Sequence, residues 1–161
     1  MKTTFLIFFV SVSFALFAQK TNEKLIYSFK TKKGKIMSLT LDTVNNVMIY
    51  RYGKKGKTEL EKKDTLYDEN TVFSYSYYFR GGAGNGGLDL NYVTFKNNDF
   101  SYKIYDEYSA DDDSRSVGIY LTNTKTGKKY EIVGLPKSVK GDLSVIRDEE
   151  YIPTEEATDE E

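Results

Sequence analysis

The strongest structural signal in the chain is the stretch Val72-Phe73-Ser74-Tyr75-Ser76-Tyr77-Tyr78-Phe79-Arg80, followed by Gly81-Gly82-Ala83-Gly84-Asn85-Gly86-Gly87 and Leu88-Asp89-Leu90-Asn91-Tyr92-Val93-Thr94-Phe95. Both flanks alternate like strands, because successive side chains of a strand point to opposite faces. One face of the first flank is predicted to carry Phe73, Tyr75, Tyr77 and Phe79, and the other Ser74, Ser76 and Tyr78. Two such runs joined by a glycine-rich loop predict a hairpin.

The same alternation recurs along most of the chain. Further strands are predicted at 25–29, 36–41, 47–52, 57–61, 100–105, 117–122 and 129–133. About nine short strands at a spacing of roughly 8–12 residues are typical of all-β domains. We therefore expect an antiparallel meander of about eight to nine strands that closes into a small barrel or sandwich, which leaves few exposed edges. The polar segment 61–70 is predicted to be a loop, and 137–146 a helical turn or a final short strand.

Composition divides the chain into three parts. Lys2, the apolar run 5–17 and the small residue Ala18 are typical of a secretory signal peptide, so residues 1–18 are predicted to be removed on export. The run is shorter than the about 20 residues that a membrane span needs. Residues 19–147 are predicted to form a single β domain. Residues 148–161 carry eight acidic and no basic side chains, and we expect a disordered acidic tail.

The residue types that are missing restrict the chemistry. The chain has no histidine and no cysteine, which removes the usual general base near neutral pH, the Ser-His and Cys-His nucleophile pairs and the ordinary zinc ligand sets. We expect a protein that is not an enzyme and needs no cofactor. The acidic run 111–113 supplies oxygen ligands, but it lacks the order of a calcium-binding loop, so a solvated turn is favoured over a calcium site.

The glycine loop formally contains the G-x-G-x-x-G pattern of dinucleotide sites. That pattern requires a helix after the glycines, whereas a strand is predicted from Leu88 onward, so nucleotide binding is not expected. Two interpretations stay open: a flexible hairpin tip, or a protruding loop that enters a partner's cleft. In the second, Arg80 engages carboxylates and the glycines let the backbone approach the partner closely.

Tyr78 and Tyr105 are out of phase with the main apolar face of their strands and are predicted to be exposed. The candidate contact residues are therefore Tyr78, Arg80, Gly81, Gly82, Gly84, Asn85 and Tyr105. The leading hypothesis is an exported β domain that binds another protein, as an inhibitor or immunity factor. The alternatives are a carbohydrate- or cell-wall-binding module that uses exposed tyrosines, and a structural protein of the cell envelope. Nucleic acid is not an expected partner of an exported protein.

One resemblance is carried by Tyr50-Arg51-Tyr52-Gly53, Tyr77-Tyr78-Phe79-Arg80-Gly81-Gly82 and Asn91-Tyr92-Val93-Thr94-Phe95. On these motifs, residues 25–133 resemble a family of small exported bacterial β-rich proteins. The resemblance implies export and a β-rich fold, and it implies no particular activity. In plan the chain is also similar to periplasmic lysozyme inhibitors, which insert a loop into a glycosidase cleft; that likeness concerns architecture alone.

Overall fold

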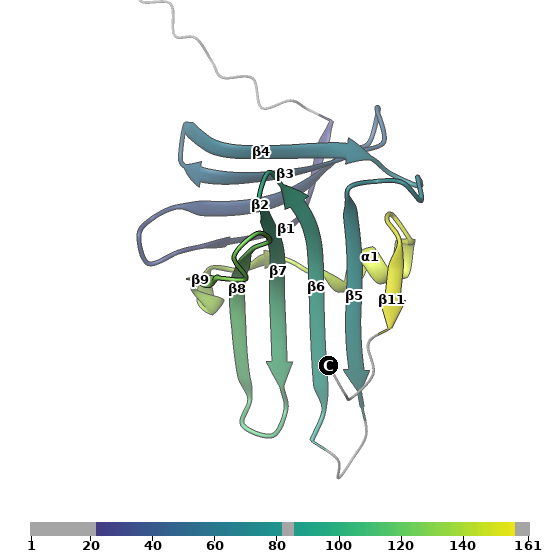
Figure 1. Cartoon of the computed structure of the whole chain (residues 1–161). Helices are drawn as coiled ribbons and strands as arrows, with labels where there is room; N and C mark the ends of the chain where they lie inside the picture. The colour runs from purple at the N-terminus through teal and green to yellow at the C-terminus, as the bar shows by residue number, and fades with distance from the viewer. Residues whose placement is uncertain (1–21, 82–85, 157–161) are drawn as a thin grey trace, which may run out of the picture.

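The computed structural model describes residues 22–81 and 86–156, which form two sheets (Figure 1). Sheet 1 contains, in spatial order, β10 (Lys140–Gly141), β1 (Glu23–Lys30), β2 (Ile36–Asp42), β3 (Val47–Lys54) and β4 (Lys57–Thr65). Sheet 2 contains β11 (Thr154–Glu156), β5 (Phe73–Arg80), β6 (Leu88–Asn97), β7 (Phe100–Ser109), β8 (Ser114–Asn123) and β9 (Lys129–Val133). The predicted signal peptide, residues 1–18, lies outside the described residues.

The all-β class and the antiparallel meander are confirmed, because β1–β4 and β5–β9 each follow one another in space as they do in sequence. Sheet 1 lies across one end of sheet 2 in Figure 1, and both sheets contribute to one core. Tyr27, Leu39 and Tyr50 enter this core from sheet 1, and Phe95 and Ile119 enter it from sheet 2. Among the described strands neither sheet closes into a barrel, so the prediction of a small barrel or sandwich is not confirmed in this detail.

The expectation of a loop over residues 61–70 is wrong in its first half. β4 continues to Thr65, and its pairing with β3 runs from Lys54 opposite Lys57 to Val47 opposite Thr65. β4 lies at the edge of sheet 1, and edge strands commonly carry charged side chains that discourage pairing with other chains. The polar composition that suggested a loop is therefore the composition of an edge strand.

The segment after β9 contains more structure than either predicted alternative. It forms a short 3-10 helix, η1 (Pro136–Ser138), then β10, and then the helix α1 (Ser144–Glu149). Tyr151 and Ile152 are buried in the core, and β11 pairs in parallel with β5. The folded body therefore extends past the domain boundary predicted at Arg147, and only residues 157–161 of the predicted tail lie outside the described part.

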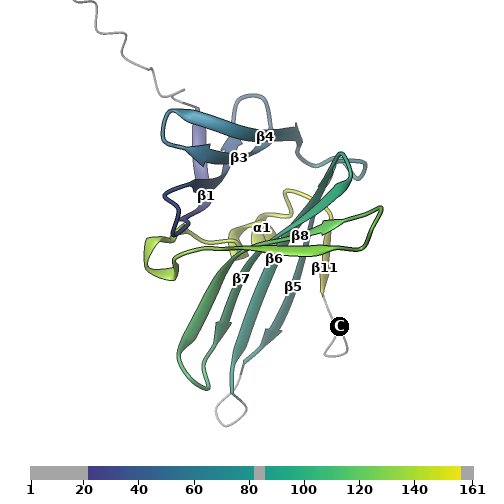
Figure 2. The same cartoon turned by 60° about the vertical axis from the view of Figure 1, so that its left-hand side comes forward.

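Sheet 2 extends beyond sheet 1 at the ends of β5–β8 that carry the β5–β6 and β7–β8 turns (Figures 1 and 2). We call this part the projecting half; it comprises residues 77–80, 88–91, 106–109 and 114–117. One face of sheet 2 packs against sheet 1 in the core, and we call the continuation of this face in the projecting half its inner face. None of the described helices is long and apolar enough to cross a membrane.

Candidate functional site

The inner face of the projecting half changes from apolar to polar in successive cross-strand rows. The row inside the core is Tyr75, Val93, Ile104 and Ile119. The next row is Tyr77, Asn91, Asp106 and Val117. The outermost row is Phe79, Asp89, Tyr108 and Arg115. Residues two apart on a strand share a face, so these three rows lie side by side on one face of the sheet. The charged side chains of the outer two rows therefore lie immediately next to the apolar row of the core.

Asp106 and Arg115 form the first part of a polar network on this face. The Asp106 residue is only 4% exposed, and the guanidinium of Arg115 donates to both of its carboxylate oxygens, Nε to Oδ1 at 2.7 Å and Nη2 to Oδ2 at 2.5 Å. This hydrogen-bonded carboxylate raises the pKa of Arg115. A buried carboxylate is retained at low cost only with such a partner. Both oxygens of the Asp106 carboxylate are thus paired with Arg115 next to the core.

Asn91 and Asp89 form the second part. The buried Tyr75 hydroxyl donates to Oδ1 of Asn91, and Nδ2 of Asn91 donates to Oδ1 of Asp89 at 2.9 Å. Nη1 of Arg147, from α1, lies 3.9 Å from the same Asp89 oxygen. The Arg147 guanidinium also lies over the rings of Tyr77 and Phe79, at 4.9 and 5.7 Å from their centroids. The network therefore joins sheet 2 to α1.

A cavity of about 160 Å³, which we call the polar pocket, opens at this network. It is lined by Asp89, Asn91, Asp106, Tyr108, Arg115 and Asp142. Five of these come from neighbouring strands of sheet 2, and Asp142 comes from the turn between β10 and α1. Oδ1 of Asp142 accepts the backbone N–H of Ser144 at 2.8 Å. No motif pointed to this pocket, because its residues come from well-separated parts of the sequence.

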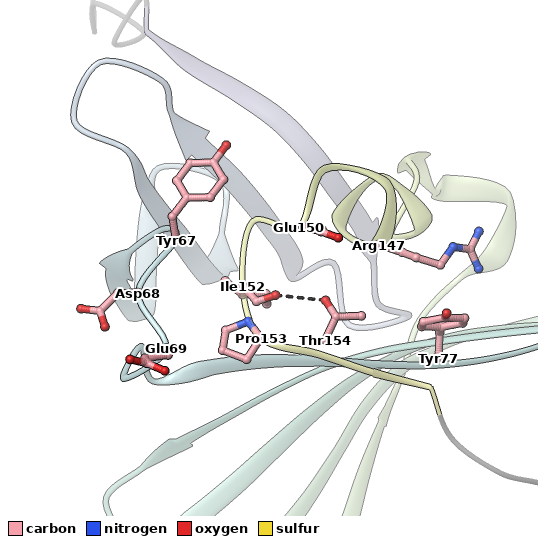
Figure 3. Close-up of a pocket in the computed structure, with 9 residues that line it drawn as sticks. All are labelled: Tyr67, Asp68, Glu69, Tyr77, Arg147, Glu150, Ile152, Pro153 and Thr154. Carbon is pink, nitrogen blue, oxygen red and sulfur yellow. Dashed lines mark hydrogen bonds between the residues drawn. The ribbon is translucent and has the colours of Figure 1, made fainter.

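A wider cleft of about 500 Å³ lies on the other side of Arg147. It is lined by Tyr67, Asp68, Glu69, Tyr77, Arg147, Glu150, Ile152, Pro153 and Thr154. In Figure 3, Asp68 and Glu69 lie at one end, Arg147 and Tyr77 lie at the other, and the segment 152–154 passes between them. Tyr67 has a left-handed backbone conformation with φ of 58°, and its N–H donates to the Tyr151 carbonyl at 2.9 Å. No sequence pattern predicted this cleft either.

Arg80 and Gly81, two of the predicted contact residues, lie exposed at the tip of the projecting half. Nε of Arg80 donates to the carbonyl oxygen of Gly86 at 3.3 Å, so this side chain bridges the two ends of the loop it was predicted to anchor. Tyr78 lies on the outer face of sheet 2 and is half-buried. Gly82, Gly84 and Asn85 lie outside the described residues.

The expectation that Tyr105 is exposed is wrong. It does lie on the outer face of sheet 2, but it is 2% exposed because its ring stacks on Tyr120 with centroids 4.3 Å apart. Its hydroxyl donates to Oε1 of Glu131 at 2.6 Å. The ring occupies space left by Gly118, where a Cβ atom would lie 2.5 Å from the Tyr105 hydroxyl. Tyr105 has almost no accessible surface to offer a partner.

The acidic run 111–113 forms the turn between β7 and β8. Asp112 accepts the backbone N–H of Ser114 at 3.2 Å, and Asp113 accepts the hydroxyl of Tyr108 at 3.1 Å. Within residues 22–81 and 86–156, no group of three or more acidic side chains is placed to hold a metal ion. These carboxylates cap the turn and orient Tyr108 at the entrance of the polar pocket.

Comparison of the chain with protein families, with curated proteins and with solved structures finds no match. The resemblance to small exported β-rich proteins therefore stays a prediction.

Proposed function

We propose that the protein is an exported, non-enzymatic binding domain that contacts another protein through the projecting half of sheet 2. The observation that carries this proposal is the exposure of Phe79 (55%) and Tyr108 (38%) on a face that inside the core is fully covered. Large aromatic side chains left exposed next to each other are typical of interaction surfaces. Here they flank Asp89 in one cross-strand row.

The surroundings of these rings support a protein as the partner. Arg147 stacks on Tyr77 and Phe79, and Arg80 follows Phe79 at the tip. Tyrosine and arginine are the side chains enriched among residues that dominate binding energy at protein interfaces. The absence of histidine and cysteine favours a binding role over a catalytic one. An inhibitor or immunity factor is the form of binding that a loop-tipped hairpin suits best.

The proposal is tested by a quantitative pull-down from the exporting cell's envelope and medium, together with a lysozyme-inhibition assay. Phe79→Ser is expected to reduce recovery of a specific partner, or inhibition, by about tenfold or more, the effect of losing an interface hot spot. Tyr130→Ser is the matched control, because Tyr130 is similarly exposed (47%) but lies on β9. Equal recovery with both variants would contradict the assignment of this surface.

A second candidate, glycan binding through the outer face of sheet 2, is favoured by one observation. Tyr120 lies partly exposed over Tyr105, and Nζ of Lys103 lies 4.1 Å from the centroid of the Tyr92 ring. Such a platform offers flat rings and charged donors to a sugar. It predicts retention on peptidoglycan that Tyr120→Ala abolishes and Phe79→Ser leaves intact. Stable self-association without either ligand would instead favour a structural envelope protein.

A further inference from the structure

The polar pocket has an excess of negative charge. Among the described residues, its lining contains the carboxylates of Asp89, Asp106 and Asp142 and one cation, Arg115. Two of the lining residues, Asn91 and Asp106, are 4% exposed, so the floor of the pocket is formed by buried polar groups. A cavity with such a floor favours a ligand that is positively charged and donates hydrogen bonds.

The pocket's own contacts leave part of this acceptor capacity unused. Asp106 is engaged on both oxygens by Arg115. Asp89 receives one bond from Asn91 and has Arg147 only at 3.9 Å, near the limit for an ion pair. Asp142 forms no ion pair with any described residue, and its bond comes from the Ser144 backbone. Asp89 and Asp142 therefore retain free lone pairs.

A buried hydroxyl lies beside Asp106, at the inner side of the polar network. Tyr27 is fully buried, and its hydroxyl lies toward Asp106 without meeting the geometry of a hydrogen bond. Burial, followed by the charge of Asp106, raises the pKa of this hydroxyl, and Asp142 acts on it in the same direction. Buried hydroxyls without a partner are uncommon in folded proteins. Tyr27 does not itself line the polar pocket, so its hydroxyl marks the buried end of the polar network beside Asp106.

The entrance of the pocket adds apolar surface to this charge. Asp89 lies directly between Phe79 and Tyr108 in the outermost row of the sheet. A lysine or arginine side chain can lay its aliphatic stem against such rings while its charged end reaches carboxylates. We propose that the polar pocket receives one lysine or arginine side chain of the partner protein. This inference rests on the proposed function and names the chemistry of the contact.

The test uses Nα-acetyl-L-arginine amide and Nα-acetyl-L-lysine amide as probes, added to the full mature chain and followed by NMR. The expected result is saturable shifts of backbone amides at Asp89, Asn91, Asp106 and Asp142. Asp142→Asn, which keeps the oxygen that accepts the Ser144 N–H, is expected to weaken binding about tenfold because one charge is removed at short range. Asp99→Asn is the control, since Asp99 pairs with Lys125 away from the pocket.

Three outcomes would overturn the inference: no saturable shift, shifts unaffected by Asp142→Asn, or equal shifts with the uncharged Nα-acetyl-L-norleucine amide or with N-acetylglucosamine. The partner assay separates this inference from the proposed function. If Phe79→Ser loses the partner while Asp142→Asn retains it fully, the surface assignment stands and the polar pocket does not receive a lysine or arginine of the partner. If both variants retain the partner, both proposals are wrong.

Discussion

Tyr50 and Tyr75 are both fully buried aromatic residues, but only one of their hydroxyls has a hydrogen-bond partner. The Tyr75 hydroxyl donates to Asn91, whereas the Tyr50 hydroxyl is buried without a partner among the described residues. Leaving a buried polar group unpaired costs about 1–3 kcal/mol. The two tyrosines therefore form a matched pair for measuring what their hydroxyl groups contribute.

Tyr50→Phe is expected to leave the free energy of unfolding unchanged or to raise it by up to about 1 kcal/mol, because it removes an unsatisfied hydroxyl. Tyr75→Phe is expected to lower it by about 1–2 kcal/mol, because Asn91 loses its donor. Urea denaturation of both variants measures the difference. Equal losses of stability would contradict the hydrogen-bond pattern of the core.

For single residues, strand alternation predicted which side chains share a face of the sheet, but it did not predict which of those side chains are buried. Phe73, Tyr75, Tyr77 and Phe79 do share one face, and burial decreases along them until Phe79 is exposed. The cause is the limited extent of sheet 1, which strand periodicity does not record. The prediction for Tyr105 was wrong for the opposite reason, because a glycine on the neighbouring strand makes room for its ring.

The segment from α1 to β11 is the element whose role was least visible in the sequence. Its acidic composition suggested a tail, yet Tyr151 and Ile152 are buried and β11 extends sheet 2 beside β5. Two apolar residues among acids are too few to produce a periodic pattern. Their burial depends on the segment after β9, which pairs with β1 through β10 and then continues through α1 to β11 beside β5 (Figures 1 and 2).

Ile152→Ala is expected to destabilise the protein by about 2–4 kcal/mol, the usual cost of truncating a buried isoleucine. Val133→Ala, at an exposed position on β9, is expected to cost less than about 0.5 kcal/mol. Chemical denaturation of the two variants provides the comparison. If Ile152→Ala is as mild as Val133→Ala, the segment after Arg147 contributes little to the fold.

For the molecule as a whole, the buried tyrosines predict a loss of stability in alkali. Burial is the main cause of the raised pKa values of Tyr27, Tyr50 and Tyr75. Up to about pH 9 these hydroxyls are protonated in both states, so they add no pH dependence. Above it the unfolded chain releases protons that the folded chain retains, which favours unfolding.

Above roughly pH 11, where tyrosines of the unfolded chain are ionised, each such group is expected to lower the free energy of unfolding by about 1.4 kcal/mol per pH unit. Tyr50→Phe should therefore make the slope of the free energy of unfolding against pH shallower by about 1.4 kcal/mol per pH unit. Urea denaturation at a series of pH values measures both slopes. A stability that stays constant from about pH 9 to 11 would show that the tyrosines ionise as readily in the folded state as in the unfolded one.

The all-β class, the meander order and the central hairpin followed from the sequence, because strand alternation and turn residues are local signals. The missing histidine and cysteine likewise restrict the possible chemistry whatever the fold, because the side chains that a chain lacks cannot be supplied by its folding. The tertiary structure alone decided that one face of sheet 2 projects uncovered, and that Asp89, Asp106 and Asp142 line one pocket. These residues meet because neighbouring strands and a returning C-terminal segment bring distant positions together, and no local pattern encodes such contacts.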